Sequence, residues 1–501
     1  MMDTVIQIPK EFQGKGLYAV LLDQGIPFSA PCGGNGTCGK CRVRLLEGVL
    51  WEKNSGRPLV PDAQGYLLAC HAVVSDTGCT VAIPALTGDG QTLSDGVSAD
   101  GGDRLGVALD IGTTTLAVAL VDLDTETVLK SASCLNPQAA YGADVMSRIA
   151  ACSEGNLLRM QMLLLDAVRE LIKELTDSRE LALETLVAVG NPTMVHIFLG
   201  ISPEGIGQYP FTPAFVTTQY RSGEALGLPV GTVIVPPSAS AFIGSDAVMG
   251  AISLDLDQAK DPVLLLDIGT NGEVFLFADD RILATSCAAG PALEGAGISS
   301  GMGGVAGAVA SVIDENGVIV YTTVKDGKAR GICGAGLVDW LACLLDDGTL
   351  EYDGYLESDV CLIGCHKTKN GTLLPAETAV TLTASDVRKV QLAKSAIRAG
   401  VETLFSVGRV DKSKLTAFCL AGGLGYYISP KSACRIGLFD SDLLPLLTSC
   451  GTTALKGAVM ALCDPAAIGR AEALCRVCET VDLNAEPEFS DAFIEYMLFP
   501  E

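Results

Sequence analysis

Alternating apolar and polar positions near the start of the chain predict a small domain of short strands. Residues 4–9 (Thr-Val-Ile-Gln-Ile-Pro) and 42–45 (Arg-Val-Arg-Leu) follow the period of two that is typical of strands with one buried face. Between them, Leu17–Asp23 has the apolar spacing of a helix. We therefore expect a domain over residues 1–88 in which short strands pack around one helix.

A polar segment separates this domain from the rest of the chain. Residues 87–103 are poor in apolar side chains and rich in Gly, Ser and Asp, which is the composition of a flexible linker. We place the linker at residues 89–104. From Leu105 onward, apolar runs that end in glycine turns alternate with helical stretches such as 156–175 and 386–405. This alternation predicts an α/β architecture.

One pattern occurs twice in the α/β part of the chain. An apolar strand runs into Asp-Ile-Gly-Thr at Asp110 and again at Asp267, about 157 residues later. Such a duplication predicts two similar halves that face each other across a cleft. We expect the first half over residues 105–261, the second over 262–465, and a C-terminal tail over 466–501.

Composition and charge narrow the functional class. The 501 residues exceed one ordinary hydrophobic core, so several domains are expected. A net charge of −25 disfavours nucleic acid and anionic membrane surfaces as partners, because both would repel the chain. The sequence has no long uncharged apolar stretch, and residues 1–4 lack the character of a secretory signal. We therefore predict a cytoplasmic protein whose 18 cysteines are thiols or metal ligands rather than disulfides.

Four cysteines surround a glycine-rich loop in the N-terminal domain. Cys32, Cys38 and Cys41 lie in one loop, and Cys70 comes from a distant segment. Thiolates bind iron, while the loop glycines let the backbone turn sharply and direct N–H groups at sulfide. The arrangement predicts a [2Fe–2S] cluster, and with the short strands it indicates a β-grasp ferredoxin. Five residues separate Cys32 from Cys38, rather than the four of plant-type ferredoxins, so the ferredoxin subtype stays open. A structural or zinc-binding role of the four cysteines is the alternative.

The repeated Asp-Ile-Gly-Thr segments have the chemistry of phosphate loops. A buried strand that ends in this sequence and turns back presents N–H groups and hydroxyls to phosphate, and its aspartate can bind Mg²⁺ or its waters. A third glycine-rich turn follows another apolar strand and would let a ligand approach the backbone closely.

Several carboxylates are candidates for a role in phosphoryl transfer. Phosphoryl transfer depends on positioning and charge neutralisation more than on covalent chemistry. We assign Asp110 and Asp267 to Mg²⁺ and its waters. Glu273, just after the second loop, is our candidate for orienting the attacking water, with a solvated or capping carboxylate as an equal alternative. Asp144 and Asp246 are weaker candidates for a catalytic carboxylate.

The three loops resemble the phosphate-1, phosphate-2 and adenosine motifs of the ASKHA superfamily, which contains acetate and sugar kinases, heat-shock ATPases and actin. The resemblance implies a nucleotide held between two similar halves, with adenine and ribose close to the backbone of the third turn. The residues that it implies to contact ATP are Gly112, Thr113, Thr114, Gly269, Thr270, Asn271, Gly422 and Gly423. A ferredoxin domain joined to such an ATPase resembles one family closely, the ASKHA-domain reductive activators of corrinoid proteins. Segments outside the loops, at residues 136–149, 189–196 and 384–397, are also similar to that family. The resemblance covers roughly residues 4–465.

The resemblance implies an enzyme that uses ATP to return the inactive Co(II) corrinoid protein of a methyltransferase system to Co(I), with an electron delivered through its cluster. It also implies a homodimer formed through the ASKHA portion and a separate partner that supplies the cobalt. The chain departs from one branch of the family, because it has no C-terminal cysteine array for two four-iron clusters. Cys361 and Cys365, like Cys475 and Cys478, lack a matching set of ligands for a second metal centre.

Two other functions fit parts of the sequence. One is a redox-sensing regulator that binds its partner in a nucleotide-dependent way without reducing it. The other is a small-molecule kinase with an appended ferredoxin, against which the agreement outside the phosphate loops weighs. No flavin or NAD fingerprint is evident, so we expect electrons from a separate low-potential donor.

Overall fold

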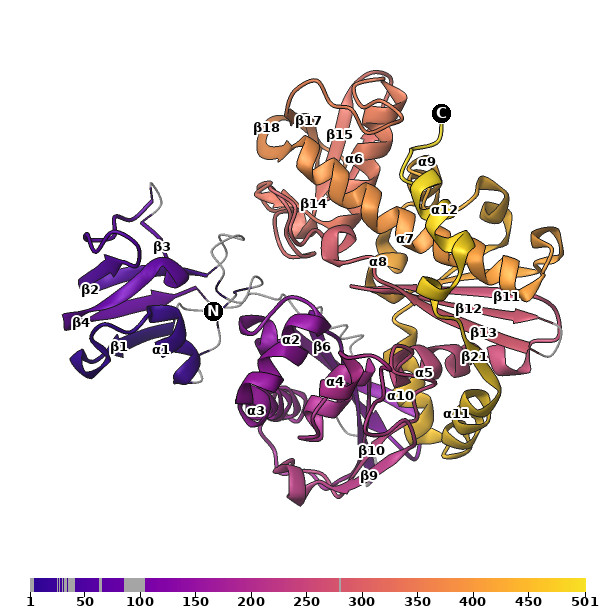
Figure 1. Cartoon of the computed structure of the whole chain (residues 1–501), viewed down its shortest axis with the longest axis horizontal. Helices are drawn as coiled ribbons and strands as arrows, with labels where there is room; N and C mark the ends of the chain where they lie inside the picture. Colours follow the sequence, from indigo (N-terminus) through magenta and orange to yellow (C-terminus); the bar gives the residue numbers. More distant parts are fainter. Residues whose placement is uncertain are drawn as a thin grey trace.

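The computed structural model describes residues 4–24, 26, 28, 30, 34, 41–62, 65–84, 104–278 and 281–501, with the backbone alone at 375–379 (Figure 1). Within these residues the strands form four sheets. Residues 89–103 of the expected linker lie outside the described part of the chain. The domain boundaries given above stay predictions.

The N-terminal sheet is small and packs against one helix. Its elements are β1 (Thr4–Ile8), α1 (Leu17–Asp23), β2 (Arg42–Glu52), β3 (Leu67–Leu68), η2 (Ala69–His71) and β4 (Ala72–Ile83). The strand order is β1-β4-β2-β3, and all neighbouring strands are antiparallel. The helix buries Leu17, Val20 and Leu21 completely, as its apolar spacing predicted.

The first half of the α/β part is built on a six-stranded sheet. Its elements are β5 (Leu105–Ile111), β6 (Thr115–Asp122), β7 (Thr127–Leu135), α2 (Val145–Ala151), α3 (Leu157–Leu175), β8 (Leu183–Gly190), α4 (Pro192–Phe198), β9 (Gln219–Ser222), β10 (Thr232–Val235) and α5 (Ser245–Ser253). The strand order is β7-β6-β5-β8-β10-β9. Strands β5, β6 and β7 are antiparallel, whereas β8 runs parallel to β5.

The second half repeats this arrangement on another six-stranded sheet. Its elements are β11 (Val263–Ile268), β12 (Gly272–Ala278), β13 (Arg281–Cys287), α7 (Ala384–Gly408), β19 (Ala417–Ala421), α8 (Gly422–Tyr427), α9 (Pro430–Arg435), β20 (Leu447–Gly451), α10 (Thr453–Cys463), α11 (Ala466–Val477), β21 (Cys478–Thr480) and α12 (Pro487–Glu495). The strand order is β20-β19-β11-β12-β13-β21. Strands β13-β12-β11-β19 therefore match β7-β6-β5-β8 in order and direction, which confirms the predicted duplication.

A five-stranded sheet lies between β13 and α7 in the chain, and the sequence analysis did not predict it. Its elements are β14 (Ala308–Asp314), β15 (Ile319–Thr323), β16 (Gly331–Ile332), α6 (Gly334–Asp346), β17 (Val360–Lys367) and β18 (Leu373–Leu382). The strand order is β16-β14-β15-β17-β18. Val309 of β14 and Leu337 of α6 are fully buried in the apolar core of the second half. The insertion thus shares the core of the half that carries it.

Helices α5 and α10 lie where the two six-stranded sheets meet (Figure 1). Ala108 from β5, Leu265 from β11, Val248 from α5 and Ala458 from α10 belong to one buried apolar cluster. Burying a side chain such as valine or leucine contributes about 1.5–3 kcal/mol, so this cluster stabilises the junction of the halves. The loops that follow β5 and β11 consequently come close enough for their side chains to touch.

The C-terminal residues pack against the second half. Strand β21 pairs with β13, and α12 lies beside α7 (Figure 1). Lys394 of α7 donates hydrogen bonds to the carbonyls of Tyr496 and Leu498, each at 2.6 Å. Burial lowers the pKa of Lys394 to about 7. Among the helices of the described residues, none combines the length and apolar character of a membrane span.

Candidate nucleotide and iron–sulfur sites

The first phosphate loop lies between β5 and β6 and is held by two asparagines. Asn136 donates to the Gly112 carbonyl at 2.8 Å, and Asn191 donates to the Thr113 hydroxyl at 3.0 Å. A Cβ at Gly112 would lie 2.6 Å from the carbonyl oxygen of Thr115, so this turn requires glycine. The sequence analysis did not single out either asparagine as a site residue, although both lie in segments that carried the family resemblance.

A buried arginine supports the same loop from α2. Arg148 is only 1% exposed, and its guanidinium donates to the Thr113 carbonyl at 2.6 Å. It also donates to the Gly142 carbonyl at 3.2 Å and to Gln138 Oε1 at 3.3 Å. Burial lowers the pKa of Arg148 to about 9, while the charge of Asp144 raises it. Arg148 therefore ties the first loop to the turn at residues 137–142.

The second phosphate loop and the third glycine-rich turn pack directly on each other. In the second loop the Gly269 N–H donates to the Asn271 carbonyl at 2.9 Å and closes the turn. Gly422, at the start of α8, has a φ of +89°, and a Cβ there would lie 2.5 Å from Asp267 Oδ1. Any side chain at Gly422 would therefore displace the aspartate. A Cβ at Gly423 would meet no atom within 4 Å.

Four carboxyl groups that influence one another lie at the ends of β5 and β11 and at the starts of β12 and α5: Asp110, Asp267, Glu273 and Asp246. Burial raises the pKa of all four, and the charge of Asp246 further raises the pKa of the other three. The pKa of Asp246 rises to about 6 and that of Asp267 to about 7. Buried carboxyls at such short range retain protons unless a cation neutralises them. The weaker candidate Asp246 thus joins the three residues that we expected here.

This donor set fits Mg²⁺, which prefers carboxylate, water and phosphate oxygens. Among the described residues, no three His, Cys, Asp or Glu side chains are arranged as a ready metal site. Mg²⁺ would therefore be held partly through water and phosphate oxygens. Glu273 lies opposite Asp267 in the β11–β12 ladder and accepts a hydrogen bond from Ser286 at 3.1 Å. Asp144, the other weaker candidate, caps α2 by accepting from the Ser147 N–H at 2.8 Å.

A fifth carboxylate joins the two phosphate loops. Glu294 Oε2 accepts hydrogen bonds from the Thr270 hydroxyl at 2.9 Å and from the Thr114 hydroxyl at 3.3 Å. The two hydroxyl oxygens are 3.4 Å apart, so the loops of the two halves converge on one side chain. Burial raises the pKa of Glu294, while the two threonine hydrogen bonds lower it. Glu294 ends the short turn η8 (Pro291–Glu294), and no local motif marked it as a site residue.

Two of the four predicted cluster ligands lie within the described residues. The sulfur atoms of Cys41 and Cys70 are 3.3 Å apart, and the Cys70 N–H donates to Cys41 Sγ at 3.5 Å. Both side chains are buried, although Cys41 precedes β2 and Cys70 lies in η2. Two converging thiols from separate elements fit the ligand set of an iron–sulfur cluster. Cys32 and Cys38 lie outside the described residues, and the four-cysteine assignment stays a prediction.

The N-terminal domain contacts the first half beside the predicted cluster loop. The Tyr18 hydroxyl donates to the Ala140 carbonyl at 2.7 Å. The Tyr18 ring also lies within 2.7 Å of where a Cβ would stand on Gly34, a residue of the cluster loop. Ala140 ends the turn η3 (Pro137–Ala140), which is N-capped by Asn136. Asn136 also holds the first phosphate loop, so this turn lies between that loop and Tyr18, which packs beside Gly34 of the predicted cluster loop.

The remaining cysteine pairs show no metal site. Cys361 and Cys365 lie on β17, while Cys475 lies on α11 and Cys478 on β21. All four are free thiols, and no metal-binding group of three suitable side chains includes them within the described parts of the chain. Burial raises the pKa of both Cys475 and Cys478 to about 12, so these thiols stay protonated at neutral pH.

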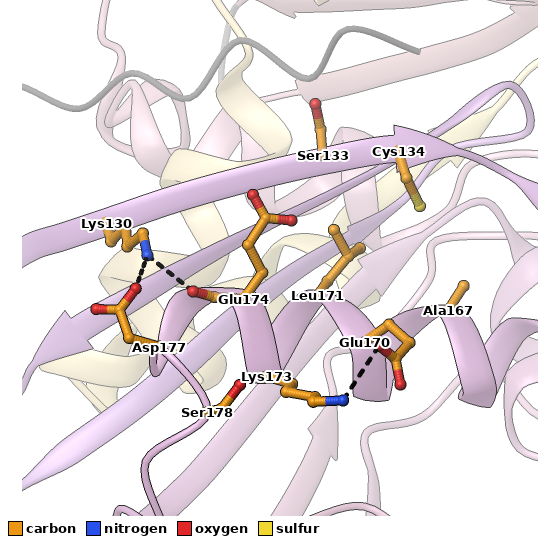
Figure 2. Close-up of a pocket in the computed structure, with 10 residues that line it drawn as sticks. All are labelled: Lys130, Ser133, Cys134, Ala167, Glu170, Leu171, Lys173, Glu174, Asp177 and Ser178. Atoms are coloured by element: carbon orange, nitrogen blue, oxygen red, sulfur yellow. Dashed lines mark hydrogen bonds and ion pairs between the residues drawn. The ribbon is translucent and has the colours of Figure 1, made fainter. Parts of the chain in front are cut away.

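A groove of about 670 Å³ lies between β7 and α3 (Figure 2). Four of its charged side chains form two ion pairs. Lys130 contacts Asp177 at 2.7 Å, and Lys173 lies 3.8 Å from Glu170. The groove shares no residue with the phosphate loops or the carboxyl cluster, and we assign no ligand to it.

Three family models together match most of the chain. Residues 5–75 match the 2Fe-2S iron-sulfur cluster binding domain. Residues 105–259 match the RACo middle region, and residues 261–501 match the C-terminal domain of RACo, the ASKHA domain. The chain therefore carries a ferredoxin-type domain followed by an ASKHA portion, as the sequence predicted.

Relatives and a solved structure agree with this assignment. The chain is 32% identical over 419 residues to the corrinoid activation enzyme RamQ of Eubacterium limosum, which covers 79% of this chain and 70% of that protein. It is 28% identical over 367 residues to the [Co(II) methylated amine-specific corrinoid protein] reductase of Methanosarcina barkeri, covering 66% of this chain and 65% of that protein. A solved reductive activator for corrinoid, iron-sulfur protein superposes with a TM-score of 0.71 at 27% identity, covering 99% of this chain and 97% of that one. The chain therefore belongs to the family of reductive activators of corrinoid proteins.

Proposed function

We propose that the protein is an ATP-dependent reductive activator, which returns the inactive Co(II) form of a corrinoid protein to Co(I). The observation that carries the proposal is the convergence of two phosphate loops on Glu294, beside a cluster of buried carboxyls. That arrangement is suited to a magnesium nucleotide. It occurs in a chain whose relatives are named for corrinoid activation and for reduction of a Co(II) corrinoid protein.

The energetics of the reaction explain why an electron-transfer protein would need a nucleotide. Co(I) corrinoids are strong reductants, so an electron from an ordinary donor moves uphill when it reaches Co(II). A gap of roughly 0.2 V corresponds to about 4–5 kcal/mol for one electron. ATP binding and hydrolysis can provide free energy of that size if they are coupled to the state of the cobalt partner.

We infer that the coupling works through closure of the two halves. Asp110, Asp246 and Asp267 would hold Mg²⁺ through its waters, while the Thr114 and Thr270 hydroxyls would donate to phosphate oxygens. A nucleotide held from both sides would favour the closed arrangement. If the closed form binds the Co(II) partner more tightly than the open form, that difference in affinity can displace an axial cobalt ligand and make reduction easier.

The N-terminal domain would supply the electron. Cys32, Cys38, Cys41 and Cys70 would hold a [2Fe–2S] cluster, which supplies one-electron transfer when bound. The contact between Tyr18 and Ala140 would keep this domain beside the turn that supports the first phosphate loop. The chain's own residues would therefore hold both sites on connected elements.

The remaining partners follow from the same proposal. We propose that electrons come from a separate low-potential donor, that the protein acts in the cytoplasm and that it forms a homodimer through its ASKHA portion. The cobalt is supplied by the corrinoid protein of a methyltransferase system.

An anaerobic ATP-turnover assay tests the proposal against its two alternatives. The purified protein, with a low-potential reductant and Mg²⁺–ATP, is incubated with and without a Co(II) corrinoid protein, and ADP, phosphate and Co(I) are measured. We expect ADP and free phosphate to form together with Co(I). Transfer of phosphate to a sugar or acid would favour the kinase. ATP-sensitive association without Co(I) would favour the redox-sensing regulator.

A further inference from the structure

Glu294 occupies the place where both phosphate loops direct their hydroxyl groups. The Thr114 and Thr270 hydroxyls come from different halves of the molecule and donate to the same carboxylate oxygen. Hydroxyls of phosphate loops are the groups that donate to phosphate oxygens when a nucleotide is bound. The Glu294 carboxylate therefore lies where the terminal phosphate of a nucleotide would meet both loops.

Glu294 has a different environment from the clustered carboxyls. The pKa values of Asp110, Asp267 and Glu273 are each raised by the charges of neighbouring cluster members. Glu294 instead accepts hydrogen bonds from Thr270 and Thr114, which lower its pKa while burial raises it. When nearby carboxyls divide into two such environments, the two sets are suited to different tasks. The cluster is suited to a cation, and the separate carboxylate is suited to accepting a proton.

The turn that carries Glu294 is firmly held. Leu293 is fully buried, and the Gly295 N–H donates to the Ala292 carbonyl at 2.9 Å. Gly295 has a φ of +81°, and a Cβ there would lie 2.8 Å from the Met302 carbonyl oxygen. The side chain therefore starts from a fixed backbone position, and its reach toward the loops does not depend on a mobile segment.

We propose that Glu294 holds and orients the water that attacks the terminal phosphate of ATP. When phosphate oxygens take over the hydrogen bonds of Thr114 and Thr270, Glu294 Oε2 becomes free to accept from a water. The water oxygen forms a bond to the terminal phosphorus, and the bond from that phosphorus to the bridging oxygen breaks. The water proton passes to Glu294, and ADP and phosphate leave. This inference rests on the proposed nucleotide site. It assigns to Glu294 the role of orienting water that we first gave to Glu273.

The test compares nucleotide binding with single-turnover hydrolysis in the full-length Glu294→Gln variant. Binding is measured with a non-hydrolysable ATP analogue and Mg²⁺, and hydrolysis is measured with enzyme in excess over ATP. Loss of a general base typically costs about 10²–10⁴-fold in rate, so we expect hydrolysis to fall at least about 100-fold. The dissociation constant of the analogue should change by less than about threefold, because the amide has the size of the carboxylate and the proposed role places the side chain on the water rather than on the nucleotide.

Two further variants sharpen the result. Glu294→Asp keeps the charge on a shorter side chain and should recover part of the lost rate. Glu184→Gln makes the same chemical change at the exposed ion pair with Arg104, at the opposite end of β8 from the loops, and should leave both readouts unchanged. Equal rates for the Asp and Gln variants would contradict the role of the charge.

The outcomes also separate this inference from the proposed function. Normal hydrolysis by the Glu294→Gln variant while the wild-type protein makes Co(I) would overturn the role of Glu294 and leave the activator function intact. Hydrolysis by the wild-type protein without Co(I) formation, together with loss of hydrolysis in the variant, would overturn the activator function and leave the role of Glu294 intact. Loss of analogue binding by the variant would assign Glu294 to closing the cleft and overturn its role with water. A wild-type protein that hydrolyses no ATP would also overturn the role of Glu294 with water.

Discussion

At the residue scale, the proposed nucleotide site contains two glycines whose neighbours leave no room for a side chain. Gly422 packs on Asp267, and Gly112 packs on the backbone of its own loop. The sequence analysis named both glycines because they stand in recognisable local motifs. It did not name Glu294, because the hydrogen bonds of that residue form only when a turn far along the chain comes to lie beside Thr114 and Thr270. No pattern within a few residues of Glu294 encodes that approach.

Replacing Gly422 by alanine should destabilise the second half. The new Cβ would lie 2.5 Å from Asp267 Oδ1, and alanine would have to adopt a φ of +89°. A left-handed conformation alone costs about 1–2 kcal/mol, so we expect the free energy of unfolding to fall by about 2 kcal/mol or more. Urea unfolding measures this quantity. Gly423→Ala is the matched control because its Cβ would meet no protein atom, and equal losses for the two variants would refute the explanation.

The carboxyl cluster predicts how stability depends on pH in the absence of Mg²⁺. The folded protein raises the pKa of Asp267 to about 7, so this group holds a proton that it would release on unfolding. The free energy of unfolding should therefore fall as the pH rises, by about 2–3 kcal/mol between pH 5 and pH 8 for this group. Asp267→Asn should remove that part of the slope. Urea unfolding in a chelator measures it, and identical slopes for the two proteins would contradict the assignment.

At the element scale, sequence periodicity located three helices but missed one sheet. Helix α1 has the predicted bounds, and α3 and α7 differ from theirs by up to three residues. Their apolar residues recur with the period of a helix, which is the strongest local signal. In β17, by contrast, Leu362 is the one buried residue, and partly exposed residues follow without alternation. A sheet whose strands lack a clean period of two gives little local signal, so the inserted five-stranded sheet was not predicted.

Arg148 gives a test of how α2 supports the first phosphate loop. Its planar guanidinium donates to the Thr113 and Gly142 carbonyls at the same time. A lysine ammonium at the same position would not reproduce both hydrogen bonds. We expect Arg148→Lys to weaken Mg²⁺–ATP binding by about tenfold, or roughly 1.4 kcal/mol. Isothermal titration calorimetry measures the affinity. Arg169→Lys, at an exposed arginine of α3, is the control. Unchanged affinity in the Arg148 variant would show that the loop does not need this support.

At the scale of the whole molecule, the two proposed chemistries belong to separate folded parts that touch beside one turn. The predicted cluster ligands lie in the N-terminal domain, whereas the predicted nucleotide residues lie in loops of the two ASKHA halves. Family motifs predicted this division because each site has its own local signature. The contact of Tyr18 with Ala140 was not predicted, since it joins residues 122 positions apart without a motif at either end.

This division predicts that each site survives loss of the other. Cys41→Ser should abolish the [2Fe–2S] spectrum and electron transfer while Mg²⁺–ATP binding stays within about threefold of wild type, a change of less than ~1 kcal/mol. Asp267→Ala should keep the cluster spectrum and lose ATP turnover. Visible spectroscopy and a nucleotide-binding assay give both readouts. Loss of ATP binding together with the cluster in Cys41→Ser would contradict independent sites.

The most direct test of the account is anaerobic visible spectroscopy of a Co(II) corrinoid partner during reduction. The partner is mixed with the cluster-loaded protein and a low-potential reductant, with and without Mg²⁺–ATP. Co(I) absorption bands that appear only when Mg²⁺–ATP is present are the predicted result. A reducible cluster that leaves Co(II) unchanged with ATP, or that forms Co(I) equally well without it, would contradict an ATP-dependent reductive activator.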